Sequence, residues 1–348
     1  MKTMNTNIRM ILATALLALT ATTAQARSWR INNNVKQKPD FIDINAAMSS
    51  EDVVAGDTLY MDPGCNLIAA QNVTKQVTII GCGYEGNDVP YGQTVISGRL
   101  NIKAADTKVI SVVTTEIVYI MANNVTLERC RTYRIRTSGD NCKNAVIRQC
   151  YCNFSGGDPV IEGAGKENTK SAFWTIENCI VLAGNTYYDP QCINGLYNAT
   201  IRNNLLVAYY GNTSYSGYTL RDIGKSLIQN NIIIHTTNAS RALYNVDTDQ
   251  LSNNVISSNT RTEYNRSNVL TTDSVYNGNV QSYVLTEDSP AKNYGADGTD
   301  CGIFGGLYPY VKGGLPYGHP YYTRYNISSR ADEKGQVKVS LNIKMQDE

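Results

Sequence analysis

The sequence has few of the residues that usually bind transition metals or act as bases near neutral pH. It contains only 2 His in 348 residues, and none of its 9 Cys forms a Cys-x-x-Cys pair. Zinc sites are commonly built from closely spaced Cys or His ligands, so the sequence does not favour one. Lys and Arg (31) nearly balance Asp and Glu (30). The net charge of +1 therefore indicates neither a nucleic-acid partner nor binding to a charged membrane surface.

Phe and Trp are also scarce. The chain has 4 Phe and 2 Trp against 24 Tyr. Because Tyr joins an apolar ring to a polar hydroxyl, this bias favours an exposed aromatic surface over a sealed aromatic core.

The first residues are typical of a secretory signal peptide. Lys2 and Arg9 supply the positive region, Met10 to Ala21 the apolar run and Ala24-Gln25-Ala26 the cleavage site. The apolar run is short for a bilayer span, and no Cys follows the cleavage point to carry a lipid. We therefore expect residues 1–26 to be removed, leaving a protein without a membrane span that is secreted, periplasmic or on the cell surface. A retained anchor is the alternative.

One nine-residue pattern recurs along the chain. The stretch ATIRNNLLV, residues 199–207, has counterparts in WTIENCIVL, AVIRQCYCN and SLIQNNIII. Units this short, with alternating apolar positions and much Ile, Val and Thr, are typical of strands that stack on their neighbours to bury an apolar face. The pattern predicts an all-β parallel solenoid with one internal file of aliphatic residues. At intervals of 20 to 29 residues, the members of this file are Ile79, Ile102, Leu127, Ile147, Ile176, Ile201, Ile228 and Leu251.

A second position of the repeat, three residues further on, alternates between Cys and Asn. Stacked strands lie about 4.8 Å apart, so Asn amides at this position can bond to one another, and Cys suits a small buried slot. A disulfide between adjacent rungs remains an alternative, and the odd number of Cys leaves at least one unpaired. In the later copies the residue before this Cys or Asn position is also Asn, which suits the left-handed backbone conformation of a tight bend. These residues are Asn178, Asn203, Asn230 and Asn253. We predict a structural ladder made of Cys82, Cys130, Cys150, Cys179, Asn204, Asn231 and Asn254.

The residue directly after each aliphatic position tends to alternate in charge. This residue faces outward in a strand, so we predict a column of exposed ion pairs, each contributing less than about 1 kcal/mol. Its members are Lys103, Glu128, Arg148, Glu177, Arg202, Gln229 and Ser252.

Three stretches resemble exported bacterial proteins of the pectin lyase-like superfamily. FIDINAAMSSEDVVAGDTLYMDPG (41–64), VTKQVTIIGCGYEGNDVPYGQTVISG (73–98) and LTEDSPAKNYGADGTDCGIFGG (285–306) are similar to its opening, following and closing segments. The resemblance implies a right-handed parallel β-helix of about eight to ten coils, with an N-terminal capping helix. We assign the β-helix domain to residues 27–312. For residues 313–348 we expect a short C-terminal β-hairpin or cap, with strands near 322–328 and 336–344.

The resemblance also suggests chemistry. Relatives that cleave acidic polysaccharides are polysaccharide lyases, which use carboxylate-bound Ca²⁺ and an Arg or Lys base, or glycoside hydrolases, which use paired carboxylates. The polygalacturonase-like signatures NTD, DD, GHG and RIK are absent here, and no acidic run recurs at the repeat spacing. Whether the chain is an enzyme is left open, with Ca²⁺ as the one candidate cofactor.

Function in such a scaffold usually resides in the segments between the repeated strands. The longest of these are 155–172, 183–198 and 209–225, which we expect to be neighbouring loops. Their Tyr rings suit stacking on sugars, although packing of the loops against the solenoid is the alternative. The candidate glycan-binding residues are Tyr187, Tyr188, Tyr209, Tyr210, Tyr215 and Tyr218.

Charged residues offer weaker candidates for catalysis or metal binding. Asp158 and Glu162 could bind a cation or act as acid and base, or belong to a turn around Gly156 and Gly157. Arg221 and Asp222 are further catalytic candidates. Asp297 and Asp300 could hold Ca²⁺ or form a capping turn. His235 is expected at a strand end, and His319 carries little signal.

Together these features indicate an exported protein that binds or processes an extracellular or cell-envelope polysaccharide along a lateral face. A non-catalytic structural or adhesive surface protein is the alternative. The sequence indicates neither the sugar nor the oligomeric state.

Overall fold

The computed structural model describes residues 26–84, 92–185, 189–210, 217–236, 241–247, 249–256, 283–285, 289–315, 320–327 and 334–345. The predicted signal peptide, all but its last residue, lies outside these ranges, as do Tyr187, Tyr188, Tyr215 and His319. Within them, no helix has both the length and the apolar character needed to cross a bilayer.

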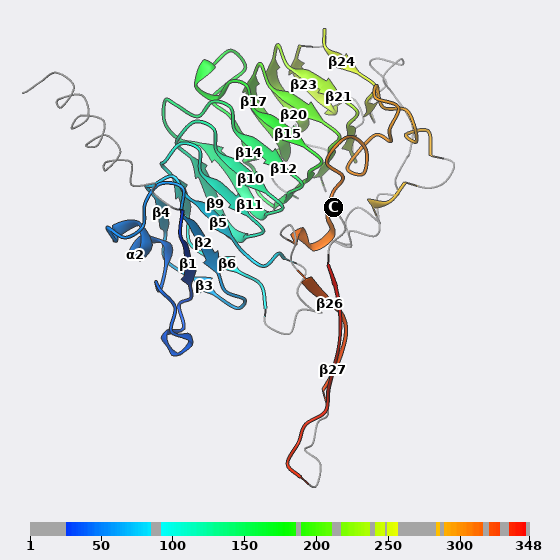
Figure 1. Ribbon diagram of the computed structural model, residues 1–348. Helices are drawn as coiled ribbons and strands as arrows, with labels where there is room; N and C mark the ends of the chain where they lie inside the picture. The colour runs from blue at the N-terminus through cyan, green and yellow to red at the C-terminus, as the bar shows by residue number, and fades with distance from the viewer. Residues whose placement is uncertain are drawn as a thin grey trace, which may run out of the picture.

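The first of two large sheets, sheet A, has ten strands in the described residues, all parallel (Figure 1). Its strands are two to four residues long and follow one another in chain order. They are β1 (Ser28–Ile31), β2 (Thr58–Met61), β5 (Thr78–Ile80), β8 (Lys108–Ile110), β10 (Thr126–Glu128), β12 (Val146–Arg148), β15 (Thr175–Glu177), β18 (Thr200–Arg202), β21 (Leu227–Gln229) and β24 (Leu251–Ser252).

The second sheet, sheet B, has fifteen described strands and is curled into two arms. Two longer strands, β9 (Val113–Ile120) and β11 (Arg131–Thr137), run through both arms, and their pairing shifts in register between Thr132 and Arg134. The first arm also contains β3 (Asn66–Leu67), β6 (Val95–Ile96), β13 (Tyr151–Phe154), β16 (Ile180–Asn185), β19 (Leu205–Tyr210), β22 (Ile232–His235) and β25 (Val255–Ile256). The second arm also contains β4 (Gln71–Val73), β7 (Leu100–Ile102), β14 (Pro159–Glu162), β17 (Gln191–Tyr197), β20 (Tyr218–Gly224) and β23 (Leu243–Val246).

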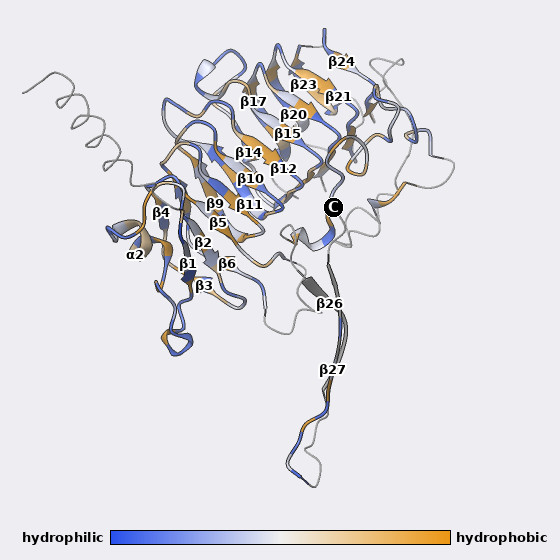
Figure 2. Cartoon of the chain, viewed as in Figure 1, coloured by the Kyte–Doolittle hydropathy of each residue, from blue (hydrophilic) through white to orange (hydrophobic). Residues whose placement is uncertain are grey.

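The chain passes repeatedly through sheet A, the first arm and the second arm, each time adding a strand beside its predecessor. The result is an all-β protein with long parallel sheets, consistent with a β-helix-like fold. Ile147, Ile176, Ile201 and Ile228 pair directly in consecutive strands and are all buried, which confirms the predicted internal file. Strands such as β20 and β23 carry apolar segments, while other strands are mixed and much of the connecting chain is hydrophilic (Figure 2).

One member of the predicted file is wrong. Ile102 lies in β7, where it pairs with Val73 and Ile120 of the second arm. The sheet A position belongs to Val109, which pairs with Ile79 and Leu127. Both positions are buried and preceded by polar residues, so the sequence pattern alone did not separate them.

The three segments expected as loops are also partly wrong, because each contains a strand of the second arm. β14 lies within 155–172, β17 within 183–198 and β20 within 209–225. These strands carry Pro, Gly and polar residues and lack the recurring motif of sheet A. Their parallel pairing to one another, rather than their composition, defines them.

The N-terminal region covers the start of the second arm. Helix α2 (Ile44–Ser49) is N-capped by Asp43, buries Ile44 and Met48, and packs against β4. Next to it, the buried carboxylate of Asp57 accepts hydrogen bonds from the backbone of Val54 and the indole of Trp29. Three short 3₁₀ turns also fall within the described residues, η1 (Val35–Gln37), η2 (Thr169–Ser171) and η6 (Lys312–Gly314).

The Cys and Asn positions form one hydrogen-bonded column inside the bend between sheet A and the first arm. Every side chain from Cys130 to Asn254 donates to the carbonyl oxygen of a file residue in the preceding strand, at 2.8–3.4 Å. From Cys179 on, each also accepts from the backbone N–H of the preceding member. The thiols therefore do more than fill a small apolar slot, because all three donate as Asn does and Cys179 also accepts, although a thiol is a weaker donor and acceptor than an amide.

Cys82 stands apart from this column. Its thiol lies 3.5 Å from the carbonyl oxygen of Met61, and its backbone N–H donates to Thr94. All nine Cys fall within the described residues, and none forms a disulfide. Burial raises the pKa of Cys152 to about 12 and that of Cys130 well above its usual value, so these thiols stay protonated and unreactive.

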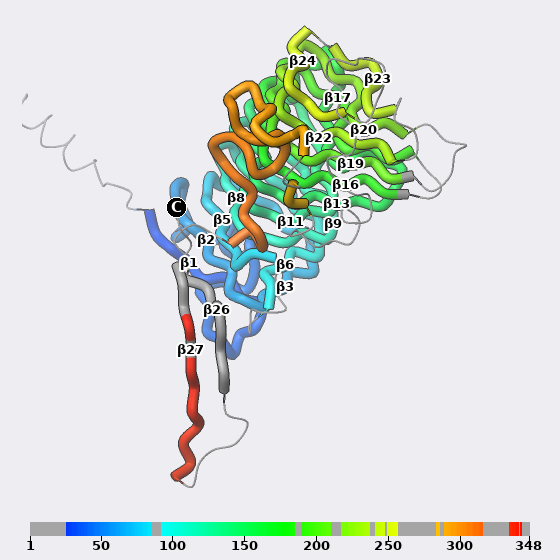
Figure 3. The backbone as a smooth tube through the Cα atoms, turned by 90° about the vertical axis from the view of Figure 1, so that its right-hand side faces the viewer, coloured from blue at the N-terminus to red at the C-terminus, as the bar shows by residue number. Residues whose placement is uncertain are grey.

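Residues 289–315, called the strap below, run back over the outside of the bend between sheet A and the first arm (Figure 3). Side chains of residues with left-handed backbone conformation, in the bends that follow strands of sheet A, form hydrogen bonds with its backbone. The contacts join Asn253 to Tyr294 O, Asn230 to Ala296 N, Asn178 to Gly305 O, Gln149 to Pro309 O and Arg129 to Leu315 O, at 2.5–2.9 Å.

The strap creates a second hydrophobic cluster on the outer side of the first arm. Ile180, Leu205 and Ile232 point outward there and are buried against Cys301 and Ile303 of the strap. The segment 285–306, expected from the resemblance to close the solenoid, thus covers its side where it is described. Beyond the strap, β26 (Pro320–Ile327) and β27 (Val339–Met345) pair antiparallel in a hairpin that extends away from the body (Figures 1 and 3).

Candidate ligand-binding face

The outer side of the second arm is the exposed counterpart of the covered first arm. Arg136, Glu162, Asn194, Arg221 and Tyr244 are direct neighbours in consecutive parallel strands from β11 to β23. The residue before each of them packs in or against the internal core, as Ile135 and Ile193 do, so these five side chains face outward. They form a continuous file across the strands, with neighbours about 4.8 Å apart.

Two Tyr rings stack at the end of this file nearest β23. The centroids of Tyr218 and Tyr244 are 4.5 Å apart, and the ring planes differ by 25°. Tyr244 remains 46% exposed. The guanidinium carbon of Arg221 lies 5.6 Å from the Tyr244 ring centroid, within cation–π range. The pair presents flat apolar surface next to hydrogen-bonding groups.

Asp222 completes this end of the face. The backbone there is left-handed (φ 53°), which brings its carboxylate back beside its neighbour, 3.2 Å from Nε of Arg221. Its other oxygen accepts a hydrogen bond from the amide of Asn245 on β23. Candidate residues Arg221 and Asp222 are thus an ion pair with unused donors and acceptors that face solvent.

Candidates Asp158 and Glu162 are brought together by a buried arginine. Arg134, whose side chain is only 5% exposed, donates to Asp158 at 2.7 Å and to Glu162 at 2.6 Å. It also donates to the carbonyl oxygen of Pro159, and Arg136 lies 3.2 Å from Glu162. This network fixes the start of β14 and leaves both carboxylates neutralised, so a structural role accounts for the pair.

A further ion pair borders the face on the sheet A side. Lys166 lies 2.7 Å from Asp247 and also donates to Asn245. The hydrogen bond that Lys166 donates to Asp247, together with the one from the backbone N–H of Lys225, lowers the pKa of Asp247. The ammonium of Lys225 lies 5.9 Å from the ring centroid of Tyr197.

The predicted glycan-binding tyrosines are only partly described. Tyr209, 41% exposed, lies near the end of β19, and Tyr218 starts β20. Tyr210 ends β19, and its side chain lies outside the described atoms, as do Tyr187, Tyr188 and Tyr215 entirely. Among the described tyrosines, the structure brings Tyr218 to the face. It adds Tyr244, which was missed because only the register of β23 against β20 places it beside Arg221.

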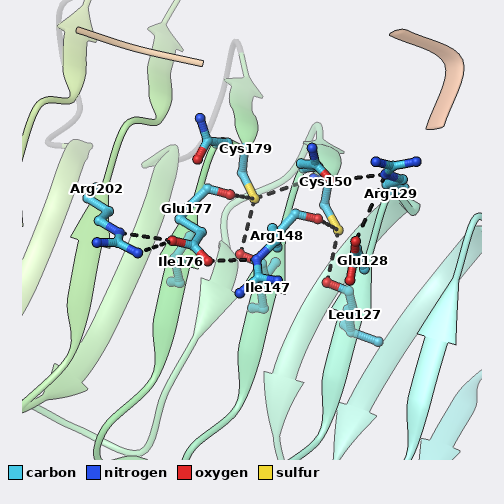
Figure 4. Close-up of polar contacts among 12 residues, drawn as sticks. Leu127, Glu128, Arg129, Ile147, Arg148, Cys150, Ile176, Glu177, Cys179 and Arg202 are labelled. Atoms are coloured by element: carbon cyan, nitrogen blue, oxygen red, sulfur yellow. Dashed lines mark hydrogen bonds and ion pairs between the residues drawn. The ribbon is translucent and has the colours of Figure 1, made fainter. Parts of the chain in front are cut away.

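The predicted column of charges on sheet A is present, but its carboxylates Glu128 and Glu177 are buried while the side chains of Arg148 and Arg202 remain partly exposed (Figure 4). The carboxylate of Glu177, 1% exposed, lies 2.7 Å from both Arg148 and Arg202. The Arg148 guanidinium packs 3.7 Å from the ring centroid of Tyr308 on the strap. Because the strap covers this part of sheet A, the column is less accessible to solvent than ion pairs on an open sheet surface. Lys103 does not belong to it, since it follows Ile102 of the second arm.

The remaining candidates have structural surroundings. Asp297 accepts hydrogen bonds from Thr299, which lower its pKa although burial opposes this, and Asp300 accepts one from the backbone of Asn293. Among the described residues, no group of three or more His, Cys, Asp or Glu could hold a metal ion. His235 ends β22, at the expected strand end.

Comparison with known proteins assigns neither a family nor a function to the chain. The chain matches no protein-family model, and no curated protein is significantly similar to it.

Proposed function

We propose that this protein binds an extracellular or cell-envelope polysaccharide on the outer face of the second arm. The observation that carries the proposal is the exposed Tyr218–Tyr244 stack beside the Arg221–Asp222 pair. Sugar rings present apolar faces edged with hydroxyl groups, and a ring surface next to paired donors and acceptors complements them. The signal peptide expected at 1–26 supports an encounter with such a polymer outside the cytoplasm.

The proposal extends to the fold. The repeated passage of the chain through three parallel strand files supports a right-handed parallel β-helix of about eight to ten coils, of the pectin lyase-like type. In this assignment α2 caps the first coil. The strands then form a rigid lateral surface on which side chains recur at a fixed spacing, suited to a polymer that crosses several strands.

Binding is a better-supported activity than cleavage. The carboxylates of the face are engaged by cations, Asp158 and Glu162 by Arg134 and Asp222 by Arg221. A general acid or base must be able to exchange a proton with the substrate, which these fixed ion pairs oppose. A lyase or hydrolase reaction is therefore the second choice.

Retention of the purified protein in native gels that contain single polysaccharides tests the proposal. Tyr244→Ala is expected to weaken retention at least about ten-fold, since stacking of a nucleic-acid base on one aromatic ring contributes about 1–3 kcal/mol and we expect a similar contribution for a sugar ring. Tyr60→Ala is the matched control, because Tyr60 has similar exposure on β2 of sheet A. Equal retention of the two variants, or no retention by any polysaccharide, would overturn the proposed face.

A further inference from the structure

The charges of the second arm bear on which class of polysaccharide the face accepts. Four cationic side chains on this face are each ion-paired within it: Arg134 with Asp158, Arg136 with Glu162, Arg221 with Asp222 and Lys166 with Asp247. Lys225 is a fifth cation, at the edge of the face toward sheet A, where its charge interacts with Asp247. Five cations against four carboxylates leave the described face nearly neutral.

The connections that lead into the second arm continue this pattern in sequence. Residues 186–188 are Thr-Tyr-Tyr, residues 211–216 are Gly-Asn-Thr-Ser-Tyr-Ser, and residues 237–240 are Thr-Asn-Ala-Ser. None carries a charge, and all supply hydroxyl, amide or aromatic groups. Asp189 follows the first of these stretches and Arg241 follows the third, so the connections before β17, β20 and β23 add one charge of each sign and leave the balance of the face unchanged.

An ion pair on a surface still has hydrogen-bonding capacity. A guanidinium has five N–H donors and a carboxylate about four lone-pair sites, of which a single pair uses only a part. Neighbouring sugar hydroxyls, each both donor and acceptor, can bridge such a pair without disturbing its charge balance. A uronate, in contrast, would compete with Asp222 or Glu162 for its arginine and place like charges side by side.

We infer that the polysaccharide bound by the second arm is neutral, a polymer recognised through hydroxyl groups and ring faces rather than through carboxylates. The inference rests on the proposed function. It also departs from the acidic polymers that the resemblance suggests.

The test compares glycans that differ only in charge. Polygalacturonate and alginate are measured beside their carboxyl-reduced forms, and galactomannan beside its C6-oxidised form. Each neutral polymer is expected to bind at least about ten-fold more tightly than its acidic counterpart, with little change at high salt. Tighter or equal binding of the acidic forms overturns the inference but leaves the proposed function standing. Retention of none of the six overturns both.

A single substitution that removes one carboxylate from the face tests the same inference in the protein. Asp222→Asn removes the carboxylate that pairs with Arg221 but keeps a side-chain oxygen that can accept the hydrogen bond from the amide of Asn245. Asn also tolerates the left-handed backbone at this position, where φ is 53°. Binding of the acidic counterparts is expected to rise about ten-fold, while binding of the neutral forms changes less than about three-fold. Asp106→Asn is the control, because it makes the same charge change at φ 59° in a bend that leads into sheet A. No gain for Asp222→Asn over this control contradicts the inference.

Discussion

The two arms of sheet B share one backbone plan and differ in what their outer sides meet. Outward residues of the first arm, such as Ile180 and Leu205, are apolar and lie under the strap. Outward residues of the second arm, such as Glu162 and Arg221, are charged and reach solvent. The inner sides of both arms pack in the same core. The comparison shows that the polarity of the outward side chains, rather than the backbone of the strands, distinguishes a covered face from one available to a ligand.

The largest expected effect comes from a charge on the covered arm. Ile180→Asp places a carboxylate in the second hydrophobic cluster, and we expect it to lower the free energy of unfolding by about 4–5 kcal/mol, because that charge has no partner there. Asn194→Asp makes the corresponding change on the exposed arm and should cost less than about 0.5 kcal/mol. Urea denaturation measures both. Similar losses for the two variants would mean that the arms do not differ as described.

The corner between the arms should respond to pH. Burial, and then repulsion by Arg241, lower the pKa of His235 to about 4, and this side chain is only 3% exposed. The unfolded chain binds the proton near its ordinary pKa of about 6.5. The stability contributed by neutral His235 is therefore present above about pH 6.5 and is lost as pH falls toward 4, on the order of 3 kcal/mol in all.

His235→Gln removes this titration. The free energy of unfolding of this variant should change less between pH 7 and pH 4 than that of the unaltered protein, as followed by thermal unfolding at closely spaced pH values. Parallel curves for the two proteins would show that His235 does not carry the effect.

Attachment of the strap can be weakened without altering the bend beneath it. Asn178→Gly keeps the left-handed backbone at φ 53° but removes the amide that donates to Ile303 O and Gly305 O, and should cost about 1–3 kcal/mol. Asn198→Gly is the control, since Asn198 has φ 51° in the bend between the second arm and sheet A. Hydrogen exchange of strap amides should rise in the first variant and stay unchanged in the second.

The smallest effect on stability is expected on the exposed arm. Tyr244→Ala removes a half-exposed ring from the stack with Tyr218 and should lower the free energy of unfolding by less than about 1 kcal/mol. A loss of several kcal/mol in urea denaturation would mean that the ring is structural, in which case weaker glycan retention by the same variant could not be assigned to lost contact.

Much of sheet A could be predicted because its strands repeat in sequence. Ile147, Ile176, Ile201 and Ile228 share a pattern with the Cys or Asn that follows, and equivalent residues stack in a parallel arrangement. The second arm has no such motif. Its strands β14, β17 and β20 were expected to be loops, since composition is a weak guide where pairing with neighbours stabilises the strand.

The candidate site was predicted only in part for the same reason. Tyr218, Arg221 and Asp222 were identified from their residue types, but Tyr244 lies 22 residues beyond Asp222 in sequence and joins them only through strand register. Burial of Glu177 was unexpected because the strap that covers this face comes from more than 110 residues further along the chain. Short-range patterns hold no information about contacts of that range.

The sequence by itself determined the repeating unit and, apart from Ile102 and Cys82, the internal aliphatic file and the Cys and Asn column, because each depends on residues a few positions apart and on their stacking against copies of themselves. Only the tertiary structure decided which outer face is covered and which is open. That outcome depends on where the strap returns and on how the second-arm strands align, and both follow from long-range packing free energy rather than local preference.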